Sequence, residues 1–338
     1  MIKSRIMKYN YSIGVDIAKK KLDVFVKKGN KKVIYTTISN DKKGFKVLQK
    51  VLKKAQIPLS EALLCAEHTG CYTYPLLAWT AENKLDLWLE SALAIKKSSG
   101  LRRGKSDKAD AESIASYAYK NQDSCNLWLV PRDAVCELKK LCWAREKLLN
   151  SINRYEKPIK EIKEIGDRKV SNLFKSTLIG LKKDLKALEK KISICVKKDD
   201  NMSRLFGILT SVTGIGPVTA NALIVETNEF TKIKEPKKMA CFAGIAPFEH
   251  TSGSSVRGKS RVSPFASKKL KKLLHMAAVS VIRFPGELAN FYKRLIAKGK
   301  AKMVAINALR KKLIDRIYAC VRNNRKYEKN YTKRLTTS

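Results

Sequence analysis

The spacing of apolar residues changes near residue 125, and this change constrains the fold more than any other feature of the chain. Before that point, short apolar runs alternate with segments in which apolar residues recur every three or four positions, which is typical of an α/β domain. After it, the apolar residues follow helical spacing. The chain has 338 residues, enough for two or three domains at roughly 150 residues each. The sequence therefore predicts an α/β domain followed by helical regions.

The first block, residues 1–124, is predicted to fold around a mixed sheet. Residues 11–17, 22–26 and 33–38 are short apolar runs with turn residues between them, so we expect a meander of three strands. The pattern further predicts strands over 62–66 and 85–89, and helices over 41–55, 74–81 and 106–119.

The second block, residues 125–200, carries apolar residues at alternating steps of three and four in two runs, 138–162 and 178–195. This heptad pattern predicts a helical hairpin or an intermolecular coiled coil. Two amphipathic helices packed on the rest of the protein would show the same pattern, so that alternative stays open. Pro158 is expected to kink the first helix, and Gly166-Asp167 to turn the chain into the second.

The third block, residues 201–338, is predicted to be mainly helical, with helices around 265–283, 287–297 and 301–322. Near its start, Gly214-Ile-Gly216-Pro fits a helix-hairpin-helix turn. Glycines in such a turn let backbone N–H groups at a helix start approach a phosphate. A Gly-Pro pair that simply ends one helix is the structural alternative. We expect Gly214 and Gly216 to contact nucleic acid.

A loop without apolar period is predicted over residues 250–261, between the helices of the third block. It contains Ser252 beside the basic residues Arg257, Lys259 and Arg261. A serine hydroxyl can act as a nucleophile on phosphorus when cations stabilise the developing charge. From the residues alone a flexible Ser/Gly loop is the simpler interpretation. The three basic residues are predicted to bind nucleic acid.

The charge balance indicates a polyanionic partner. Lys and Arg number 71 against 30 Asp and Glu, a net charge of +41. Residues 1–124 contribute +12, residues 125–200 contribute +8 and residues 201–338 contribute +21. Nucleic acid is the polyanion that such an excess most often serves.

The apolar stretches are far shorter than the ~20 residues of a membrane span, and the basic N-terminus lacks the apolar core of a signal peptide. We therefore expect a cytoplasmic, nucleoid-associated protein without a membrane partner. Eight cysteines include no C-x-x-C pair and only three histidines are present, which argues against structural zinc and for reduced thiols.

Four acidic residues in the first block stand at the ends of predicted elements. Asp16 lies near the end of the first strand, Glu67 follows the run 62–66, and Asp107 and Asp110 share one face of a helix's first turn. Asp16, Asp107 and Asp110 have structural alternatives, since strand-end aspartates form turns and acids in a first turn cap helices. Together they predict a site for Mg²⁺ or Mn²⁺, which prefer oxygen ligands. Two such ions can clamp a phosphodiester, so phosphoryl transfer on nucleic acid is the expected reaction.

The chain resembles the insertion sequence 110 family of DEDD-type transposases, also called bridge-RNA-guided recombinases. In the first block the resemblance rests on Ile13-Gly-Val-Asp16, Ala66-Glu67-His-Thr-Gly-Cys-Tyr and Lys105-Ser-Asp107-Lys-Ala-Asp110-Ala. In the third block it rests on Thr213-Gly-Ile-Gly-Pro-Val-Thr-Ala220, Phe242-Ala-Gly-Ile-Ala-Pro247 and Ser252-Gly253. The chain departs from the family at Val262-Ser-Pro-Phe-Ala-Ser-Lys268, where a Ser-Lys-Arg-Gly-like stretch is usual.

The resemblance implies a ribonuclease-H-like, RuvC-like catalytic domain (1–124), a coiled-coil linker (125–200) and a C-terminal transposase domain with a serine loop (201–338). It implies that Asp16, Glu67, Asp107 and Asp110 form a metal-binding tetrad and that Ser252 is a nucleophile making a covalent link to DNA. It further implies a homo-oligomer, a dimer or tetramer, and target choice by a noncoding guide RNA.

Three alternatives follow from the residues themselves. Ser254 and Ser255 compete with Ser252 for the nucleophile role. A metal-dependent junction nuclease in which water attacks would need no serine at all. A non-catalytic nucleic-acid-binding scaffold would use the acids only to cap and brace.

Overall fold

The structure is a computed structural model, which describes residues 9–67, 69–98, 106–166, 168–252, 256–263 and 266–328. The chain forms two units, Met1–Val130 and Pro131–Ser338. The predicted three-block division therefore stays a prediction, because the second and third blocks form one unit by their contacts. Within the described residues, no helix is both long and apolar enough to cross a membrane.

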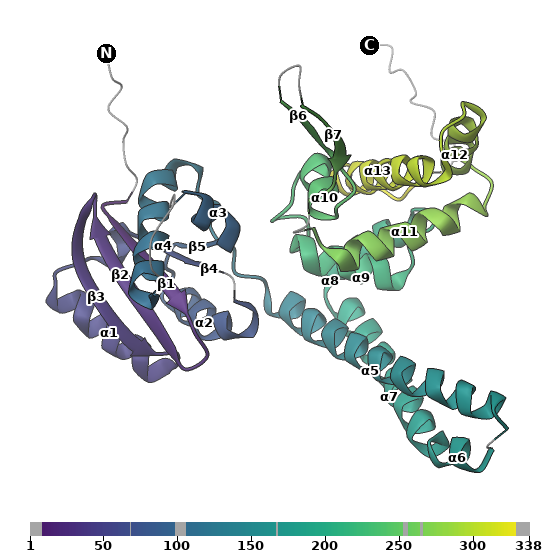
Figure 1. Ribbon diagram of the computed structural model, residues 1–338, viewed down its shortest axis with the longest axis horizontal. Coiled ribbons are helices and arrows are strands. Elements are labelled where there is room, and N and C mark those ends of the chain that lie inside the picture. The colour runs from purple at the N-terminus through teal and green to yellow at the C-terminus, as the bar shows by residue number, and fades with distance from the viewer. Residues whose placement is uncertain are drawn as a thin grey trace. The chain divides into compact units, whose positions relative to one another are not determined.

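The first unit is built on a five-stranded mixed sheet (Figure 1). Its strands lie in the order β3-β2-β1-β4-β5. Strands β1 to β3 form an antiparallel meander, and β4 and β5 continue the sheet parallel to β1, which confirms the predicted meander and mixed sheet. The strand bounds are Tyr11–Ile17 for β1, Lys21–Lys28 for β2, Lys31–Ser39 for β3, Ala62–Glu67 for β4 and Leu87–Glu90 for β5.

Helices cover both faces of this sheet (Figure 1). One face packs its alternate apolar residues against α1 (Lys42–Lys54) and α2 (Tyr74–Glu82). The other packs against α3 (Ala92–Ser98) and α4 (Asp107–Asn121). Among its described residues, the unit also has short 3-10 turns at Leu59–Glu61, Gly70–Thr73 and Gln122–Ser124. The predicted helices match α1, α2 and α4, whereas α3 was not predicted.

Close packing of α4 on the sheet depends on a glycine. A Cβ added at Gly14 of β1 would lie 2.2 Å from the carbonyl oxygen of Ala111 and 2.3 Å from the backbone nitrogen of Ala115. Both contacts are with helix backbone, which cannot rotate away as a side chain can. The missing side chain at Gly14 therefore sets how near α4 comes to the middle of β1.

The second unit is mainly helical, as predicted. Its helices are α5 (Asp133–Glu164), α6 (Arg168–Leu173), α7 (Lys175–Lys198), α8 (Asp200–Ser211), α9 (Pro217–Thr227), α10 (Pro236–Phe242), α11 (Lys268–Ile282), α12 (Glu287–Ala297) and α13 (Lys302–Arg322). Helices α5 and α7 pack along each other as a hairpin (Figure 1), the intramolecular form of the heptad prediction. Helix α5 continues through Pro158. The base of the hairpin joins the core of the unit through Val135, Leu138 and Ile192.

The loop predicted over 250–261 is wrong in part, because the structure has a two-stranded hairpin there. Strands β6 (Phe248–Ser252) and β7 (Val256–Arg261) pair antiparallel. A ribbon of two strands is held by backbone hydrogen bonds, and these leave no apolar period in the sequence. Residues 253–255, which include the alternative nucleophiles Ser254 and Ser255, lie outside the described residues.

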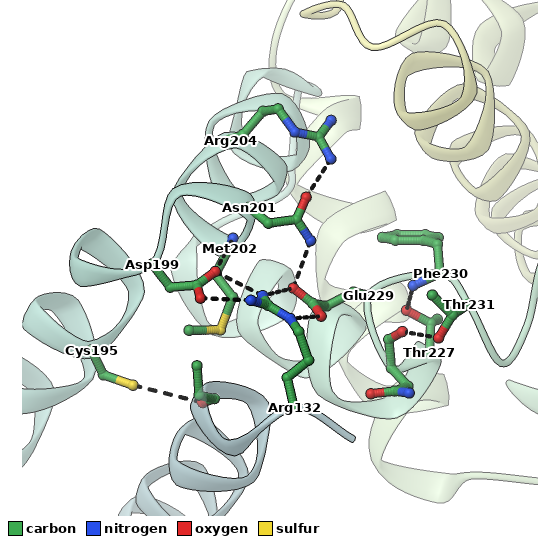
Figure 2. A network of polar contacts seen from close by, with 12 residues as sticks. Arg132, Cys195, Asp199, Asn201, Met202, Arg204, Thr227, Glu229, Phe230 and Thr231 are labelled. Carbon is green, nitrogen blue, oxygen red and sulfur yellow. Dashed lines mark hydrogen bonds and ion pairs between the residues drawn. The ribbon is translucent and has the colours of Figure 1, made fainter. Parts of the chain in front are cut away.

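A polar cluster around Arg132 fixes the start of α5 to the rest of the second unit (Figure 2). Its guanidinium donates two hydrogen bonds of 2.8 Å to the carboxylate of Asp199, the N-cap of α8. It also donates to both carboxylate oxygens of Glu229, at 2.5 and 2.9 Å. Asn201 donates a further hydrogen bond to Glu229 at 2.7 Å. The first residue after the boundary proline is thus anchored to α8 and to the end of α9.

Candidate nuclease site

Four carboxylates form a row across one edge of the sheet, one on each of four neighbouring strands. Asp16 of β1 pairs with Asp23 of β2, and Glu67 of β4 pairs with Glu90 of β5. Val15 pairs with Ala66 in the parallel β1–β4 ladder, so the next residue of each strand brings Asp16 beside Glu67. The row therefore reads Asp23, Asp16, Glu67, Glu90.

These carboxylates face α4 rather than the α1–α2 side. Their chain neighbours, such as Val15, Leu22 and Ala66, belong to the apolar cluster under α1 and α2. Alternate residues of a strand point to opposite faces, which places the acids on the α4 face. Apolar packing of one side of the sheet thus decides which side carries the charge.

The first turn of α4 adds Asp107 and Asp110 above this row. Ser106 caps the helix by accepting a hydrogen bond of 3.2 Å from the Ala109 backbone nitrogen. The helix begins at Asp107, one residue after the predicted start at 106, and the two aspartates occupy its first turn. The N-terminal end of a helix dipole favours negative charge there.

The structure brings all four predicted acids into electrostatic contact. The pKa of Asp16 is raised from 3.8 to about 6. Burial is the largest cause, followed by the charges of Asp110, Asp107, Asp23 and Glu67. Mutual repulsion among carboxylates that share a site makes the binding of a cation favourable.

Lys21 is a functional candidate that the sequence analysis missed. Its Nζ lies 2.5 Å from Oδ2 of Asp107 and 3.1 Å from Oδ2 of Asp23. Hydrogen bonds to Asp107 and then Asp23 raise the pKa of the ammonium. Lys21 therefore neutralises one end of the acidic site, and it ties the first turn of α4 to β2.

Asp23 and Glu90, at the two ends of the row, were also missed. Asp23 accepts hydrogen bonds of 2.7 Å from both Tyr35 and Thr37. Burial alone would raise the pKa of Asp23, but these hydrogen bonds and the ammonium of Lys21 outweigh it and lower the pKa. The signal that could have found Asp23 is the antiparallel register, since the tight β1–β2 turn pairs it with Asp16.

Glu90 is likewise held by its own partners. It accepts hydrogen bonds from the Tyr117 hydroxyl at 3.2 Å and from the Ser91 backbone nitrogen at 2.7 Å. Burial, and then the negative charge of Glu90, raise the pKa of Tyr117 to about 12. Asp23 and Glu90 thus accept hydrogen bonds from protein groups, whereas the charged form of Asp16 is disfavoured by burial and then by the neighbouring acids.

The donor set suits a hard divalent cation, because it consists of carboxylate oxygens. As these side chains stand, no group of three or more His, Cys, Asp or Glu among the described residues is arranged to hold a metal ion. The ion pair between Lys21 and Asp107 turns one candidate ligand toward the ammonium. Rotation of side chains about a fixed backbone would be needed to close a metal site.

The glycines predicted to contact nucleic acid differ in their surroundings. Gly214 has a φ of +89°, and a Cβ there would lie 2.7 Å from the Ala277 carbonyl oxygen and 2.5 Å from a methyl carbon of Val281. Packing against α11 therefore explains Gly214. Gly216 is the N-cap of α9, without a side-chain cap and with open space where a Cβ would be, so this helix start is accessible to a ligand.

The remaining predicted residues lie on the β6–β7 hairpin of the second unit. Ser252 is the last residue of β6 and pairs with Val256. Arg257, Lys259 and Arg261 occupy alternate positions of β7. The acids and the serine thus belong to different units of the chain.

Two family models match the sequence. One, described as Transposase and named DEDD_Tnp_IS110, matches residues 13–164, which include the whole carboxylate row. The other, described as Transposase IS116/IS110/IS902 family, matches residues 207–293, which include Ser252. The two family models together define a transposase, an enzyme that transfers phosphoryl groups of DNA. The chain belongs to the IS116/IS110/IS902 family of transposases.

Several relatives are similar along the chain. The pilin gene-inverting protein of Moraxella bovis is 29% identical over 327 residues, covering 94% of this chain and 97% of the relative. That of Moraxella lacunata is also 29% identical over 327 residues, with the same coverage. An insertion element IS110 uncharacterized 43.6 kDa protein of Streptomyces coelicolor is 27% identical over 153 residues, covering 45% of this chain and 36% of the relative.

Among solved structures, Thermus thermophilus RuvC in complex with a Holliday junction substrate covers 36% of this chain and 100% of that chain. The sequence identity is 11% and the TM-score is 0.28. The order and direction of the strands agree with the predicted mixed-sheet domain, and the helices that follow agree with the predicted mainly helical region.

Proposed function

We propose that this transposase cuts and rejoins DNA through a covalent serine–phosphate intermediate. In this proposal Asp16, Glu67, Asp107 and Asp110 bind Mg²⁺, or Mn²⁺ in its place. The observation that carries the proposal is the carboxylate row, in which four strands and one helix start contribute acids to one edge of the sheet. In a basic protein, such a concentration of acids is explained if the acids bind divalent cations that contact a phosphodiester.

Asp16 is the central ligand of the proposed site. It lies in the middle of the row, and its pKa is raised first by burial and then by neighbouring negative charges, which a cation would offset. Glu67 stands beside it on β4, and Asp110 faces it from α4. When bound, Mg²⁺ supplies positive charge to the attacking and leaving oxygens of the phosphodiester. Asp107 joins the ligand set once its carboxylate leaves the ammonium of Lys21.

Ser252 is the proposed nucleophile. Its Oγ attacks phosphorus, a P–O bond forms, and the bond from phosphorus to the leaving sugar oxygen breaks. The serine proton passes to a base, and the leaving oxygen gains a proton. In the rejoining step a sugar hydroxyl of the new partner strand attacks the same phosphorus, loses its proton and releases the serine. The position of Ser252 beside the tip of the basic β6–β7 hairpin supports this role.

The names of two relatives support the rejoining of DNA ends rather than simple cutting. The Moraxella proteins are named for inverting a pilin gene, and inversion needs strand ends that are rejoined. A covalent intermediate conserves the energy of the broken phosphodiester bond for that step. This chain is similar to those proteins along nearly its whole length.

We further propose that a guide RNA from the element selects the target and that the protein works as a homo-oligomer. The net charge of +41 is large enough for the chain to bind RNA and DNA together. If base pairing supplies sequence specificity, the protein needs to recognise only shape and phosphates. An oligomer would allow the acids of one copy to act with the serine of another.

The deciding experiment is the search for a protein–DNA adduct. Purified protein is incubated with Mg²⁺, RNA from the flank of its element and labelled donor DNA, and the products are separated under denaturing conditions. An adduct that is lost in Ser252→Ala, but kept in Ser254→Ala and Ser255→Ala, supports the proposal. Asp16→Asn is expected to abolish the adduct while DNA binding is retained.

The other outcomes separate the alternatives. Cleaved DNA without any adduct would identify a nuclease in which water attacks. Binding with neither cleavage nor adduct would identify a scaffold. Loss of the adduct when RNA is left out supports guidance, whereas an equal yield with and without RNA contradicts it.

A further inference from the structure

A polar cavity lies beside α4, toward the other end of this helix from the acidic row. Its volume is about 240 Å³, the size of a small polar group rather than of a drug-sized ligand. It is bordered by the end of β2, the β2–β3 turn, the end of α3 and the C-terminal half of α4. Among the lining residues are Lys27, Asn30, Glu112, Ser116, Tyr119 and Lys120.

Lys27 is the unusual member of this lining. It is only 9% exposed, although lysine is almost never fully buried without a partner. Its Nζ donates one hydrogen bond, of 3.0 Å, to Oγ of Ser116. Among the described residues no carboxylate forms an ion pair with it. A buried ammonium has three protons to donate and a high cost if they are left unmet.

The chemistry of the lining favours an anion. Two ammonium groups, of Lys27 and Lys120, outweigh the one carboxylate, of Glu112. The side chains of Asn30, Ser116 and Tyr119 add hydrogen-bond donors. Two lysines disfavour a metal cation, and the polar lining disfavours an apolar ligand. An anion rich in acceptor oxygens and small enough for the cavity meets each of these conditions.

The cavity lies beside β2 and α4, and both of these elements also carry acids of the acidic site. Lys27 lies four residues beyond Asp23 on β2, about 13 Å at the rise of a strand. Ser116 lies six residues beyond Asp110 on α4, about 9 Å at the rise of a helix. A nucleic-acid strand held at the acidic row can therefore present a phosphate a few nucleotides away to this cavity.

We infer that the Lys27 cavity binds a backbone phosphate of a nucleic-acid strand and so holds that strand in register with the acidic site. The link to the acidic site rests on the proposed function, but binding at the cavity does not. Neither the cavity nor Lys27 belongs to the DEDD tetrad. The ligand is a phosphodiester, which either DNA or RNA can supply.

The test measures binding without cleavage. Full-length protein in EDTA is titrated into labelled DNA from the element's end, in single-stranded and duplex form, and into RNA of the same sequence. Anisotropy is recorded over a range of salt concentrations. Each lost phosphate contact lowers the salt slope by about 0.7 on single strands and 0.9 on duplex DNA, which is roughly five- to eightfold in affinity at 0.1 M salt. Lys27→Met is expected to show this loss.

The matched control is Lys28→Met, which removes the same charge from the next residue of β2. Lys28 is exposed and its Nζ lies over the ring of Tyr11 at 5.4 Å. It should change the slope much less than Lys27→Met, and Lys27→Arg should keep most of the slope. Lys120 lies on the exposed side of the cavity. If Lys27→Met lowers stability, Lys120→Met provides a second test, because it should lower the salt slope as well.

Each outcome decides a point. A salt slope lowered only for DNA assigns the cavity to the substrate strand. A slope lowered only for RNA assigns it to a guide. A slope lowered equally for both supports a shared phosphate site. An unchanged slope in both cavity variants, or an equal loss in Lys28→Met, overturns the inference. Because the assay contains no divalent metal, these results stand whether or not the tetrad is catalytic.

Discussion

Replacing Gly14 by alanine should push α4 away from β1 and so separate the acids of the site without changing any of its charges. The new Cβ would lie 2.2 Å from the Ala111 carbonyl oxygen, whereas contact between such atoms needs about 3.3 Å or more. The helix must therefore retreat by about 1 Å. Asp107 and Asp110 move with it, away from Asp16.

Two magnitudes follow from this displacement. Overpacking of a close contact costs about 1–3 kcal/mol, of which the loss of glycine's unfolded-state freedom offsets roughly 0.5 kcal/mol. We expect Gly14→Ala to lower the free energy of unfolding by about 1–2 kcal/mol. A misplacement of about 1 Å at a catalytic constellation can cost on the order of 10²-fold in rate, so DNA cleavage should fall far more than stability does.

The assay pairs urea unfolding, followed by circular dichroism, with Mg²⁺-dependent cleavage of donor DNA. Gly180→Ala on α7 is the control, since a Cβ there meets nothing within 4 Å. It should stabilise the helix by about 0.5–1 kcal/mol and leave cleavage unchanged. A Gly14→Ala protein with the stability and cleavage rate of the parent would refute the idea that this close approach positions the acids.

Three further changes probe the charges. Asp16→Asn should raise the metal-free free energy of unfolding at pH 7.5 by at most about 3 kcal/mol, measured by urea unfolding. An acid whose folded pKa is raised from 3.8 to about 6 contributes stability below pH 4 that is lost as the pH rises through 6, so the gain should vanish at pH 3.5. Lys21→Met should tighten Mn²⁺ binding several-fold by calorimetry, because no ammonium then competes for the carboxylates. Lys19→Met, which removes an exposed charge, should change that affinity less. Arg132→Met should destabilise the second unit by about 2 kcal/mol in thermal unfolding, less than for a fully buried ion pair because Arg132 is half exposed. The reason is that the buried carboxylate of Glu229 would lose its cation. An unchanged melting temperature would contradict the expected destabilisation.

Local signals in the sequence were sufficient for most of the elements. Strand β1 and helix α12 have the predicted bounds, because an apolar period of two or of three to four is written in neighbouring residues. Helix α4 begins within one residue of its predicted start, because the Ser106 hydroxyl that caps it acts within three residues. The β6–β7 hairpin was missed, since pairing between backbones leaves no such period.

The sequence by itself determined the α/β and helical regions, the excess of positive charge and the four acids at element ends. Only the tertiary structure decided that Asp16 stands between Asp23 and Glu67, because strand register is a long-range property that no single segment encodes. The same is true of Lys21, whose ammonium meets Asp107 across 86 positions of the chain. The role of Gly14 also appears only when α4 lies on β1, since the absence of a side chain has meaning only where another backbone fills its place.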